Sequence, residues 1–417
     1  MKSFLFTLCF SLLYGSMSFG QLLLKPERVF DGNEMHNNWV VLVKGEMITY
    51  AGPESGLKIP KGTKTLDLND MTLMPGLIEG HSHLLLHPYN ETPWNDQVLK
   101  ESPVERSLRG ANHARASLMS GVTTMRDLGS EGAGYADVYL KQSIDKGIIP
   151  GPRLLVAGPA IVATGAYGPK GFHDGVNVPL GAESTSGIEG VIATARRQLG
   201  KGADFIKVYA DYRWQPGAPS QPTFLQEELN AMVATATSAG SYVVAHASTP
   251  EGMKRAIMAG VETIEHGDGG TLEVFSMMKE KGVVFYPTLA AGDAIEQYRG
   301  WKKGLELDTD RIQNKRASFK LALQSGVTIG FGGDVGVYTH GENYRELELM
   351  VDYGMSPIDV LRAATSINAR TFHLDILGEI KTGFIADLIA VQGNPAKDIT
   401  QLKNVQLVLQ SGKIIKH

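Results

Sequence analysis

The stretch Leu73-Met74-Pro75-Gly76-Leu77-Ile78-Glu79-Gly80-His81-Ser82-His83 decides how this chain is interpreted. Its apolar run is typical of a buried strand, and two histidines one residue apart close it. Side chains alternate along a strand, so His81 and His83 are predicted to point to the same side, where two imidazoles can hold one divalent cation. Alone, the pair fits metal-free surface histidines equally well, and the remaining ligands must decide.

Four later segments each have the pattern of a strand that ends in a metal-ligand side chain. These segments are residues 203–209 with Lys207, 242–246 with His246, 263–266 with His266, and 328–334 with Asp334. Stretches of helical composition with glycine stops lie between them. Strands and helices in alternation predict a parallel sheet, and eight repeats predict an α/β fold closed into a (β/α)8 TIM barrel.

The expected elements follow from this alternation. Barrel strands are predicted at residues 73–79, 122–126, 153–157, 205–209, 242–245, 263–265, 283–286 and 327–331. Helices are predicted at residues 105–120, 133–146, 187–201, 225–239, 251–259, 272–281, 309–324 and 344–353, and one more at 358–372, opened by Ser356 and Pro357. Every candidate ligand then falls near the C-terminal end of a strand, where barrel enzymes place their chemistry.

Both ends of the chain contain short strands and turns instead. Residues 22–68 show a hairpin around Gly45-Glu46, and residues 387–416 show a similar pattern. Two β-rich ends around an α/β middle predict a small composite β-sandwich built from both termini. The expected division is a signal peptide at 1–20, the sandwich at 21–72 with 375–417, and the barrel at 73–374.

The first twenty residues have the pattern of a secretory signal. Lys2 precedes an apolar stretch over residues 4–19, and Ser18-Phe19-Gly20 fits a small-x-small cleavage site. The alternative is an anchor helix, but the stretch is interrupted by polar residues and is shorter than the roughly 20 residues that a span needs. We therefore expect export to the periplasm or the medium, with no stable membrane span after cleavage.

Composition limits the partners and the metal ligands. The chain has 417 residues, 43% hydrophobic, and a net charge of −4 from interspersed acids and bases, a pattern that suggests neither nucleic acid nor an anionic membrane. The one cysteine, Cys9, lies in the signal segment. A mature chain without cysteine forms no disulfide and no thiolate metal site, so metal must be held by histidine, carboxylate or modified lysine.

Lys207 is the most diagnostic residue. Alternation points Phe205, Lys207 and Tyr209 into the barrel, where an ammonium is poorly solvated and a depressed pKa is expected. Its neutral amine can react with carbon dioxide to form a carbamate, an anionic ligand able to bridge two metal ions. The alternative is a lysine that pairs with an acid or extends to the rim.

The other candidates have structural alternatives too. His246 and His266, taken singly, fit core histidines bonded to backbone carbonyls, although two at successive strand ends favour ligation. Asp334 follows Gly330-Phe331-Gly332-Gly333 and fits a turn or helix-cap aspartate. Arg126 and Asp127, at the end of the second strand, favour a structural ion pair.

The ordered set His-x-His, Lys, His, His, Asp resembles the amidohydrolase superfamily, at strands one, four, five, six and eight of its barrel. The resemblance runs from about residue 44 to the C-terminus. Met125-Arg126-Asp127-Leu128-Gly129, Ala386-Asp387-Leu388 and Gly393-Asn394-Pro395 resemble the prolidase-like and imidazolonepropionase-like branch. Beside this precedent, the carbamate of Lys207 is favoured.

The resemblance implies two divalent metal ions, with zinc as the expected metal. His81, His83 and Asp334 would hold the more buried ion, His246 and His266 the other, and carbamylated Lys207 would bridge them. A metal-bridged hydroxide would attack a polarised carbonyl, and Asp334 would carry its proton to the departing nitrogen.

Substrate contacts are expected from three further residues. The Tyr209 hydroxyl is placed to bind a substrate carboxylate or an oxyanion. Tyr167 lies in a loop, residues 163–168, that resembles a family segment with histidine at this position, and it can still donate a hydrogen bond. His340, in the loop after Asp334, is a candidate pocket residue or an exposed loop histidine.

The sequence thus predicts an exported, prolidase-like amide hydrolase whose small-molecule substrate is a dipeptide (Xaa-Pro or similar) or an N-acyl amino acid. Deamination is disfavoured, because His246-Ala247-Ser248-Thr249 lacks the glutamate that the superfamily's deaminases carry three residues after this histidine. A mononuclear cyclic-amide hydrolase, like imidazolonepropionase, and a non-catalytic secreted binding barrel stay open. So does the oligomeric state, a homo-oligomer included.

Overall fold

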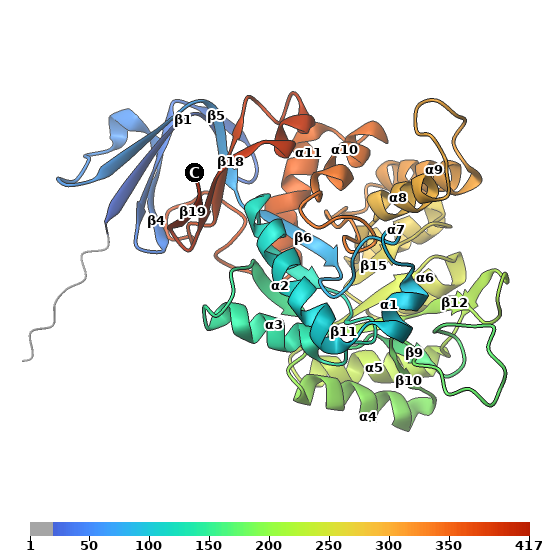
Figure 1. The fold of residues 1–417 in the computed structure, drawn as a ribbon. Coiled ribbons are helices and arrows are strands. Elements are labelled where there is room, and N and C mark those ends of the chain that lie inside the picture. The colour runs from blue at the N-terminus through green and yellow to red at the C-terminus, as the bar shows by residue number, and fades with distance from the viewer. Residues whose placement is uncertain (1–19) are drawn as a thin grey trace, which may run out of the picture.

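A computed structural model describes residues 20–417 as a mixed α/β fold with two β-rich regions (Figure 1). One region is a sheet formed by both ends of the chain. The other is a set of parallel strands enclosed by helices, on which the candidate ligands lie. The predicted signal segment lies outside the described residues except for Gly20.

The terminal sheet has the strand order β19-β18-β17-β5-β1-β3-β4, with β2 paired to β1. β17, from the C-terminal end, pairs antiparallel with β5, from the N-terminal end, in the register Leu388↔Pro75. Apolar side chains from both ends, among them Leu24, Leu73 and Leu407, form a core of their own. The elements of this region are β1 (Gln21–Phe30), β2 (Met35–Asn37), β3 (Trp39–Lys44), β4 (Met47–Pro53), η1 (Glu54–Gly56), β5 (Lys64–Pro75), β17 (Leu388–Gln392), η3 (Ile399–Lys403), β18 (Val405–Gln410) and β19 (Lys413–Lys416).

The central strands form a three-stranded sheet, β6-β7-β8, and a six-stranded sheet, β10-β9-β11-β14-β15-β16. All pairs in both sheets are parallel. A separate hairpin, β12-β13, follows β11. Their bounds are β6 (Leu77–Ser82), β7 (Val122–Asp127), β8 (Arg153–Val156), β9 (Ile161–Ala163), β10 (Glu183–Thr185), β11 (Ile206–Tyr209), β12 (Asp211–Arg213), β13 (Ser220–Pro222), β14 (Val243–Ala247), β15 (Thr263–His266) and β16 (Val284–Tyr286).

The predicted first barrel strand is divided in the structure. Its first three residues belong to β5 of the terminal sheet, and β6 starts at Leu77. Gly76 lies at the crossing and donates to Asp387 O at 2.9 Å. A Cβ on Gly76 would lie 2.1 Å from Thr123 Oγ1, so only glycine fits this turn between the two regions.

The predicted last barrel strand, residues 327–331, is not a regular strand. It forms only isolated parallel bridges, Phe285↔Ile329 and, just beyond it, Ser82↔Val335. The glycines here permit close packing instead: a Cβ on Gly330 would lie 2.4 Å from the ring of Tyr286. The prediction of a regular strand is therefore wrong, although the segment lies between β16 and β6.

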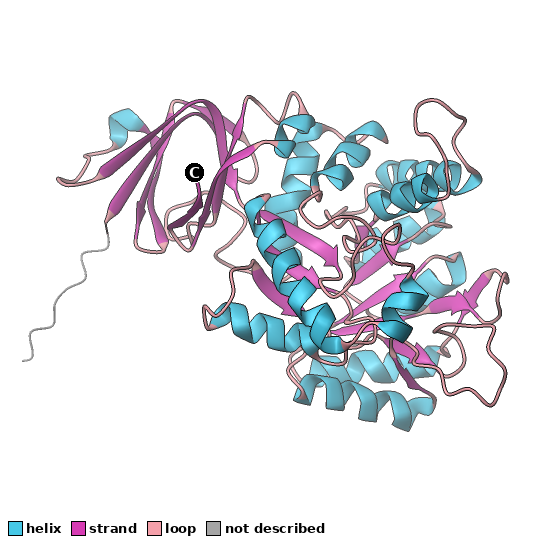
Figure 2. Cartoon of the chain, viewed as in Figure 1, coloured by secondary structure: helices cyan, strands magenta, loops and turns pink. Residues whose placement is uncertain are grey.

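Helices cover the outside of the central strands (Figure 2). Three of them, α6, α7 and α9, have the caps that make sequence prediction reliable: a threonine whose hydroxyl accepts from the first turn, and a left-handed glycine after the last turn. The helices are α1 (Trp94–Lys100), α2 (Pro103–Met119), α3 (Ala136–Asp145), α4 (Gly187–Gly200), α5 (Gln226–Ser238), α6 (Pro250–Ala259), α7 (Leu272–Lys281), α8 (Leu289–Tyr298), α9 (Asp310–Ser325), α10 (Tyr344–Asp352), α11 (Pro357–Arg362), η2 (Ala363–Ile367) and α12 (Asn368–Thr371).

Three features of the helices differ from expectation. α1 and α8 were not predicted, and neither start has a side-chain cap of its own. Glu346 of α10 instead accepts from Leu289 N at 3.0 Å and Ala290 N at 2.6 Å, a long-range cap that no local pattern shows. The predicted helix over residues 358–372 is interrupted by the π-helical turn η2.

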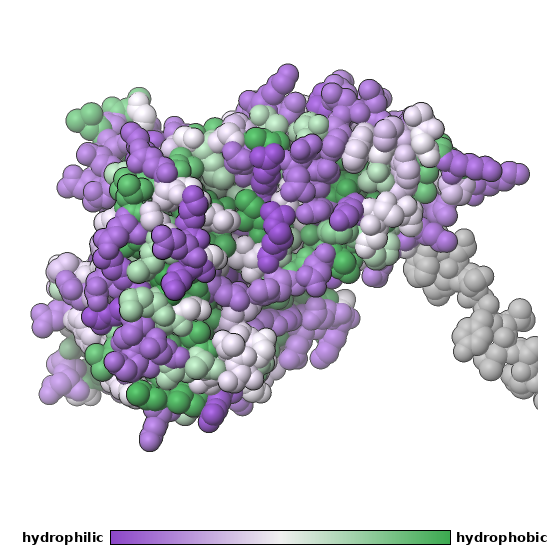
Figure 3. Space-filling model, turned by 180° about the vertical axis from the view of Figure 1, so that it is seen from behind, coloured by the Kyte–Doolittle hydropathy of each residue, from purple (hydrophilic) through white to green (hydrophobic). Residues whose placement is uncertain are grey.

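The surface seen in Figure 3 is mostly hydrophilic, with hydrophobic residues in small groups between polar ones. Within residues 20–417, no helix combines the length and the apolar character needed to cross a bilayer.

Candidate metal centre and active site

Four histidines and one aspartate converge where β6, β14 and β15 end. The centroids of the His81 and His83 rings lie 5.4 Å apart, those of His81 and His266 5.0 Å, and those of His246 and His266 4.5 Å. Asp334 Oδ1 lies 3.4 Å from His83 Nε2 and 3.7 Å from His81 Nε2. The structure therefore brings five of the six predicted ligand side chains into direct proximity.

The tightest group within this cluster is His81, His266 and Asp334, whose ligand atoms all lie within 4.8 Å of one another. Imidazole nitrogens and a carboxylate oxygen are donors suited to a divalent transition metal. His81 and Asp334 are expected to bind one ion and His266 the other. Because all three lie in one group, the two expected metal positions are adjacent.

Neighbouring acceptors fix the orientation of three of the rings. His81 Nδ1 lies 2.7 Å from Glu265 Oε2, His83 Nδ1 2.9 Å from Gly129 O, and His266 Nδ1 2.8 Å from Thr288 Oγ1. A ring that uses Nδ1 in this way presents its Nε2 lone pair to the cluster. This is the arrangement of metal-binding histidines.

Glu265 also forms a fully buried ion pair, because its Oε1 lies 2.9 Å from Arg126 Nη2 and both side chains have zero exposure. The predicted pair between Arg126 and Asp127 is wrong. Adjacent strand residues point to opposite faces, and Asp127 instead accepts from Leu84 N at 2.8 Å and Gly129 N at 3.3 Å.

Lys207 is 1% exposed, and within residues 20–417 its Nζ has no hydrogen-bond partner. It lies 5.7 Å from the centroid of the Tyr209 ring, on the face that β11 shares with the histidines. Burial lowers the pKa of the Lys207 ammonium to about 8, although Glu265 and Asp334 oppose this shift. A share of the amine is therefore neutral near that pH, and the neutral amine is the form whose lone pair attacks carbon dioxide.

Burial also favours the neutral form of three of the imidazoles. It lowers the pKa of His246 to about 3 and the pKa values of His81 and His266 well below their ordinary range, with Lys207 contributing to each shift. Neutral imidazoles have the lone pairs that a metal needs. Burial raises the pKa of the Asp334 carboxyl, while His83 and Lys207 oppose the rise.

Backbone strain is concentrated at this site. Eight non-glycine residues among those described have positive φ, and four of them line one cavity: Glu131 at 48°, His266 at 75°, Thr288 at 48° and Asp334 at 61°. Residues other than glycine are rarely stable in this region, so the surrounding packing must hold them there. For His266 the left-handed backbone breaks the strand alternation, and Glu265 and His266 can both face the cluster.

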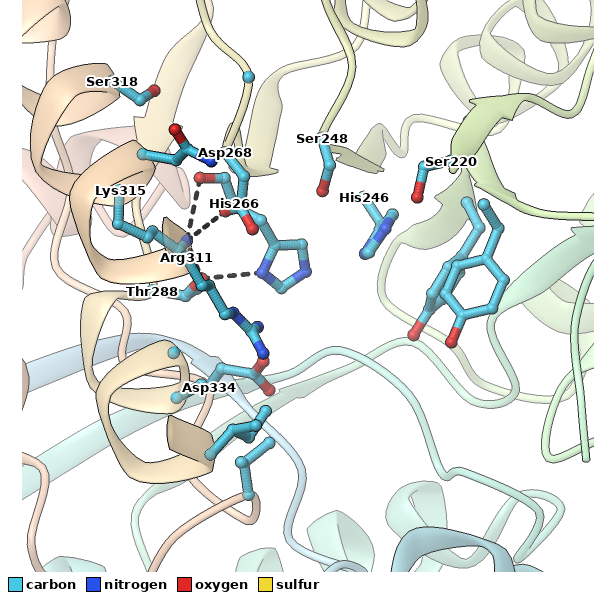
Figure 4. Close-up of a pocket in the computed structure, with 18 of the residues that line it drawn as sticks. Ser220, His246, Ser248, His266, Asp268, Thr288, Arg311, Lys315, Ser318 and Asp334 are labelled. Carbon is cyan, nitrogen blue, oxygen red and sulfur yellow. Dashed lines mark hydrogen bonds and ion pairs between the residues drawn. The ribbon is translucent and has the colours of Figure 1, made fainter. Parts of the chain in front are cut away.

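The cavity has a volume of about 990 Å³. Figure 4 shows the His266 ring held by Thr288, with His246 across from it and Asp334 on the same side as Arg311. Lys315 is paired with Asp268 at 2.5 Å on the wall formed by α9. The cavity is also lined by His83, Tyr89, Trp94, Glu131, Tyr167, Tyr209, Tyr212, Arg213, His246, Ser248, Thr249, Arg299, Asn314 and Val337.

Two of the three predicted substrate residues line this cavity. Tyr167 Oη donates to Glu131 Oε2 at 2.9 Å, and Tyr209 Oη donates to Glu131 Oε1 at 3.4 Å. Burial, with the charge of Glu131, raises the pKa values of both phenols well above their ordinary range, so both stay protonated donors. Their hydroxyl protons point to a protein carboxylate, which the sequence did not reveal.

The third, His340, is not among the residues that line the cavity. It is 6% exposed, its Nε2 lies 3.1 Å from Leu86 O, and its ring stacks on His113 at 4.3 Å. In the structure it is a buried histidine that links the loop after Asp334 to the loop after His83, and its role in substrate binding stays a prediction.

The sequence also missed Glu131, Glu265 and Thr288. Glu265 had a local signal, since an acid directly before a ligand histidine in an apolar strand needs a partner. Glu131 stands between Gly129 and Gly132, glycines with φ of 148° and 95°, in a turn that allows unusual backbone angles. Thr288 had no local signal, because its role depends on a ring twenty-two residues away.

Residues 72–415 match the Amidohydrolase family. Ochratoxinase from Aspergillus niger is 29% identical to this chain in an alignment that covers 93% of it and 84% of the fungal protein.

Two solved structures extend the likeness. A Xaa-Pro dipeptidase with methionine bound in its active site is 31% identical, with a TM-score of 0.83 over 95% of this chain and 100% of the other. A prolidase in complex with N-methylphosphonate-L-proline is 27% identical, with a TM-score of 0.81 over 95% of this chain and 100% of the other.

Proposed function

Because this chain belongs to the amidohydrolase family, we propose that it hydrolyses the amide bond of a dipeptide, Xaa-Pro or similar, or of an N-acyl amino acid. Its similarity to ochratoxinase and to the prolidase-like structures supports a hydrolase that acts on carbon–nitrogen bonds.

The observation that carries the metal-dependent part of this proposal is Lys207. A buried amine without a partner is costly, and it lies beside imidazoles that would repel its charge if they were protonated. Conversion to a carbamate removes the positive charge and adds two oxygen ligands. This chemistry explains why a lysine occupies this position.

The donor set fits two divalent ions, and zinc is the metal we propose. His81, His83 and Asp334 would hold one ion, His246 and His266 the other, with carbamylated Lys207 between them. Such ions, when bound, polarise a carbonyl and lower the pKa of water toward neutrality.

The chain's own residues have defined tasks in this proposal. Glu265, Gly129 and Thr288 hold three imidazoles in the orientation that presents Nε2. Asp334 accepts the proton of the attacking water at its carboxylate and returns it to the nitrogen that leaves.

The strand arrangement supports the barrel and the domain division that we propose. Asp204 N donates to Val156 O at 2.8 Å, next to the end of β8 and the start of β11, and the segment around Ile329 bridges toward β16 and β6. These contacts support an eight-stranded barrel at residues 73–374. The sheet of both termini, with its own core, supports a separate composite domain at 21–72 with 375–417.

We also propose export, with cleavage after Gly20. The support is the signal-like pattern of residues 1–20 and the start of β1 at Gln21, directly after the proposed cleavage site. N-terminal sequencing of the protein from its native host tests this. A mature chain that still begins at Met1 would contradict it.

The activity is tested with a panel of dipeptides and N-acyl amino acids, on enzyme stripped of metal by a chelator and then reloaded with zinc. We expect release of the amine product only after reloading. No metal-dependent release from any member would favour a non-catalytic binding barrel. Ring opening of a cyclic amide added to the panel, without hydrolysis of the linear members, would favour the imidazolonepropionase-like alternative.

The bridge is tested with Lys207→Ala beside Lys279→Ala, a control at an exposed lysine on α7. We expect the Lys207 variant to lose activity and half of its bound zinc, and short carboxylates such as acetate to restore part of both. Reloading of the wild type should also require bicarbonate. Full activity in Lys207→Ala would remove the bridge.

A further inference from the structure

The cavity wall opposite α9 contains a carboxylate that the proposed hydrolysis does not use. Glu131 follows β7 and is 2% exposed. Its carboxylate accepts from Trp94 Nε1 at 2.8 Å and from the Tyr167 and Tyr209 hydroxyls at 2.9 and 3.4 Å. It accepts three hydrogen bonds and lines the cavity.

Every one of these donors is neutral. Arg106, the nearest buried guanidinium, donates instead to the backbone oxygens of Glu131 and Ser130, at 2.6 and 3.2 Å. Over residues 20–417 no lysine, arginine or histidine side chain forms a salt bridge with the Glu131 carboxylate. Arg106 and Lys207 attract this carboxylate through space, but among the described residues no cation is in direct contact with it, whereas buried carboxylates are normally paired.

Aromatic rings pack against one another beside Glu131 and line the same part of the cavity. The Tyr167 ring lies 5.4 Å from Trp94, 4.7 Å from Tyr209 and 4.8 Å from Tyr212, all between centroids. We call Glu131 with these four rings the aromatic box. Aromatic rings attract cations, and a wall of rings beside one carboxylate suits an ammonium or a quaternary ammonium group that approaches from the cavity.

The aromatic box lies close to the proposed metal centre. A Cβ placed on Gly129 would lie 3.4 Å from Glu131 Oε1 and 3.6 Å from His83 Cε1, so both side chains flank one glycine. A group held in the box therefore belongs to the part of the substrate next to the bond that is cleaved.

We infer that the aromatic box binds a positively charged nitrogen of the substrate, and that this enzyme selects amides whose acyl part carries an ammonium group. The inference rests on the proposed function and names its substrate class more narrowly. It also changes the expected role of Tyr167 and Tyr209. Their protons are committed to Glu131, so they orient the carboxylate that receives the cation and are not free for a substrate carboxylate.

The source of the cation is either the free α-amine of a dipeptide or the side-chain amine of a basic acyl residue. Three substrates with one leaving group distinguish them: a dipeptide with a free α-amine, the same dipeptide N-acetylated, and an N-acetylated dipeptide with lysine as its acyl residue. Faster turnover of the first alone identifies the α-amine, and faster turnover of the third over the second identifies the side chain.

Glu131→Gln tests the charge, since glutamine keeps the shape and an acceptor. We expect KM for the cationic substrate to rise about 10- to 100-fold, with the N-acetylated neutral substrate changed less than about twofold. Glu189→Gln, at an exposed position on α4, is the matched control and should change neither. Tyr167→Phe, which retains the carboxylate, should show the same selectivity with a smaller rise.

Binding provides a readout that does not need turnover. Calorimetry on the zinc-loaded enzyme compares choline with its neutral isostere 3,3-dimethyl-1-butanol. We expect choline to bind the wild type at least about tenfold more tightly than it binds Glu131→Gln, and the isostere to show no such difference.

These experiments separate the two proposals. Choline binding that depends on Glu131, without hydrolysis of any amide, would remove the proposed function and keep the cation site. Hydrolysis with equal losses for cationic and neutral substrates in Glu131→Gln, or choline binding equal to that of the isostere, would overturn the cation site and leave the hydrolase intact.

Discussion

Removal of the Glu265 carboxylate should lower both the stability of the fold and the affinity for metal, for two different reasons. Glu265 accepts from His81 at one oxygen and pairs with Arg126 at the other, and all three side chains are buried. In Glu265→Met the guanidinium of Arg126 keeps its charge without a partner, and the His81 ring loses the acceptor that orients it.

The structure gives a magnitude for each loss. Stranding one member of a buried ion pair costs roughly 3–5 kcal/mol of the free energy of unfolding. Loss of the acceptor that orients a metal-binding histidine weakens metal affinity by about 10- to 100-fold. The double variant Arg126→Met/Glu265→Met removes the stranded charge, and its methionines can pack against Tyr286 and Phe372, whose ring centroids lie 4.9 and 4.4 Å from the guanidinium carbon.

We therefore expect the double variant to regain most of the stability lost in Glu265→Met, while both variants bind zinc equally weakly. Urea unfolding of the metal-free proteins measures stability, and competition with a chromogenic chelator measures affinity. Wild-type zinc affinity in Glu265→Met would refute the role of Glu265 in orienting His81, and a double variant no more stable than the single would refute the stranded charge as the cause.

Three further predictions concern single side chains. Asp334→Asn should lower kcat by about 10²- to 10⁴-fold with folding intact, because asparagine tolerates the left-handed backbone at φ 61°; an unchanged kcat and pH profile would rule out Asp334 as the proton carrier. Thr288→Gly should leave the free energy of unfolding near that of the wild type, because glycine suits φ 48°. It should lower the affinity for one of the two zinc ions by about 10- to 100-fold in a zinc titration, and an unchanged affinity would mean that the Thr288 hydroxyl does not orient His266. Burial raises the pKa of Glu346 from 4.5 to about 8, so its contribution to stability is complete below pH 4.5 and is lost as pH rises through 8. Urea unfolding of metal-free protein should show the wild type losing stability relative to Glu346→Gln between pH 5 and 8, by about 1.4 kcal/mol per pH unit, and parallel curves would contradict the shift.

The convergence of the candidate ligands could be predicted because each of them has a local signal. His81, His83, His246 and His266 each close a run of strand-forming residues, and parallel strands bring their ends together. Most helices were also predicted to within a few residues, since threonine caps and left-handed glycines mark their limits in the sequence.

What the sequence could not show depends on contacts between distant residues. α8 begins where Glu346 of another helix caps it. Arg126 pairs with Glu265 across the strands, because its neighbour Asp127 points the other way. The environment of Glu131 could not be predicted, because its carboxylate accepts hydrogen bonds from Trp94, Tyr167 and Tyr209, which come from three separate segments.

The central claim is that Lys207 is converted to an anion that joins two metal ions held by His81, His83, His246, His266 and Asp334. X-ray diffraction from zinc-loaded crystals, with anomalous data at the zinc edge, measures this directly. We predict two anomalous peaks among these side chains and added density on Lys207 Nζ that reaches both. A bare Lys207 amine with no zinc peak near it would contradict the claim.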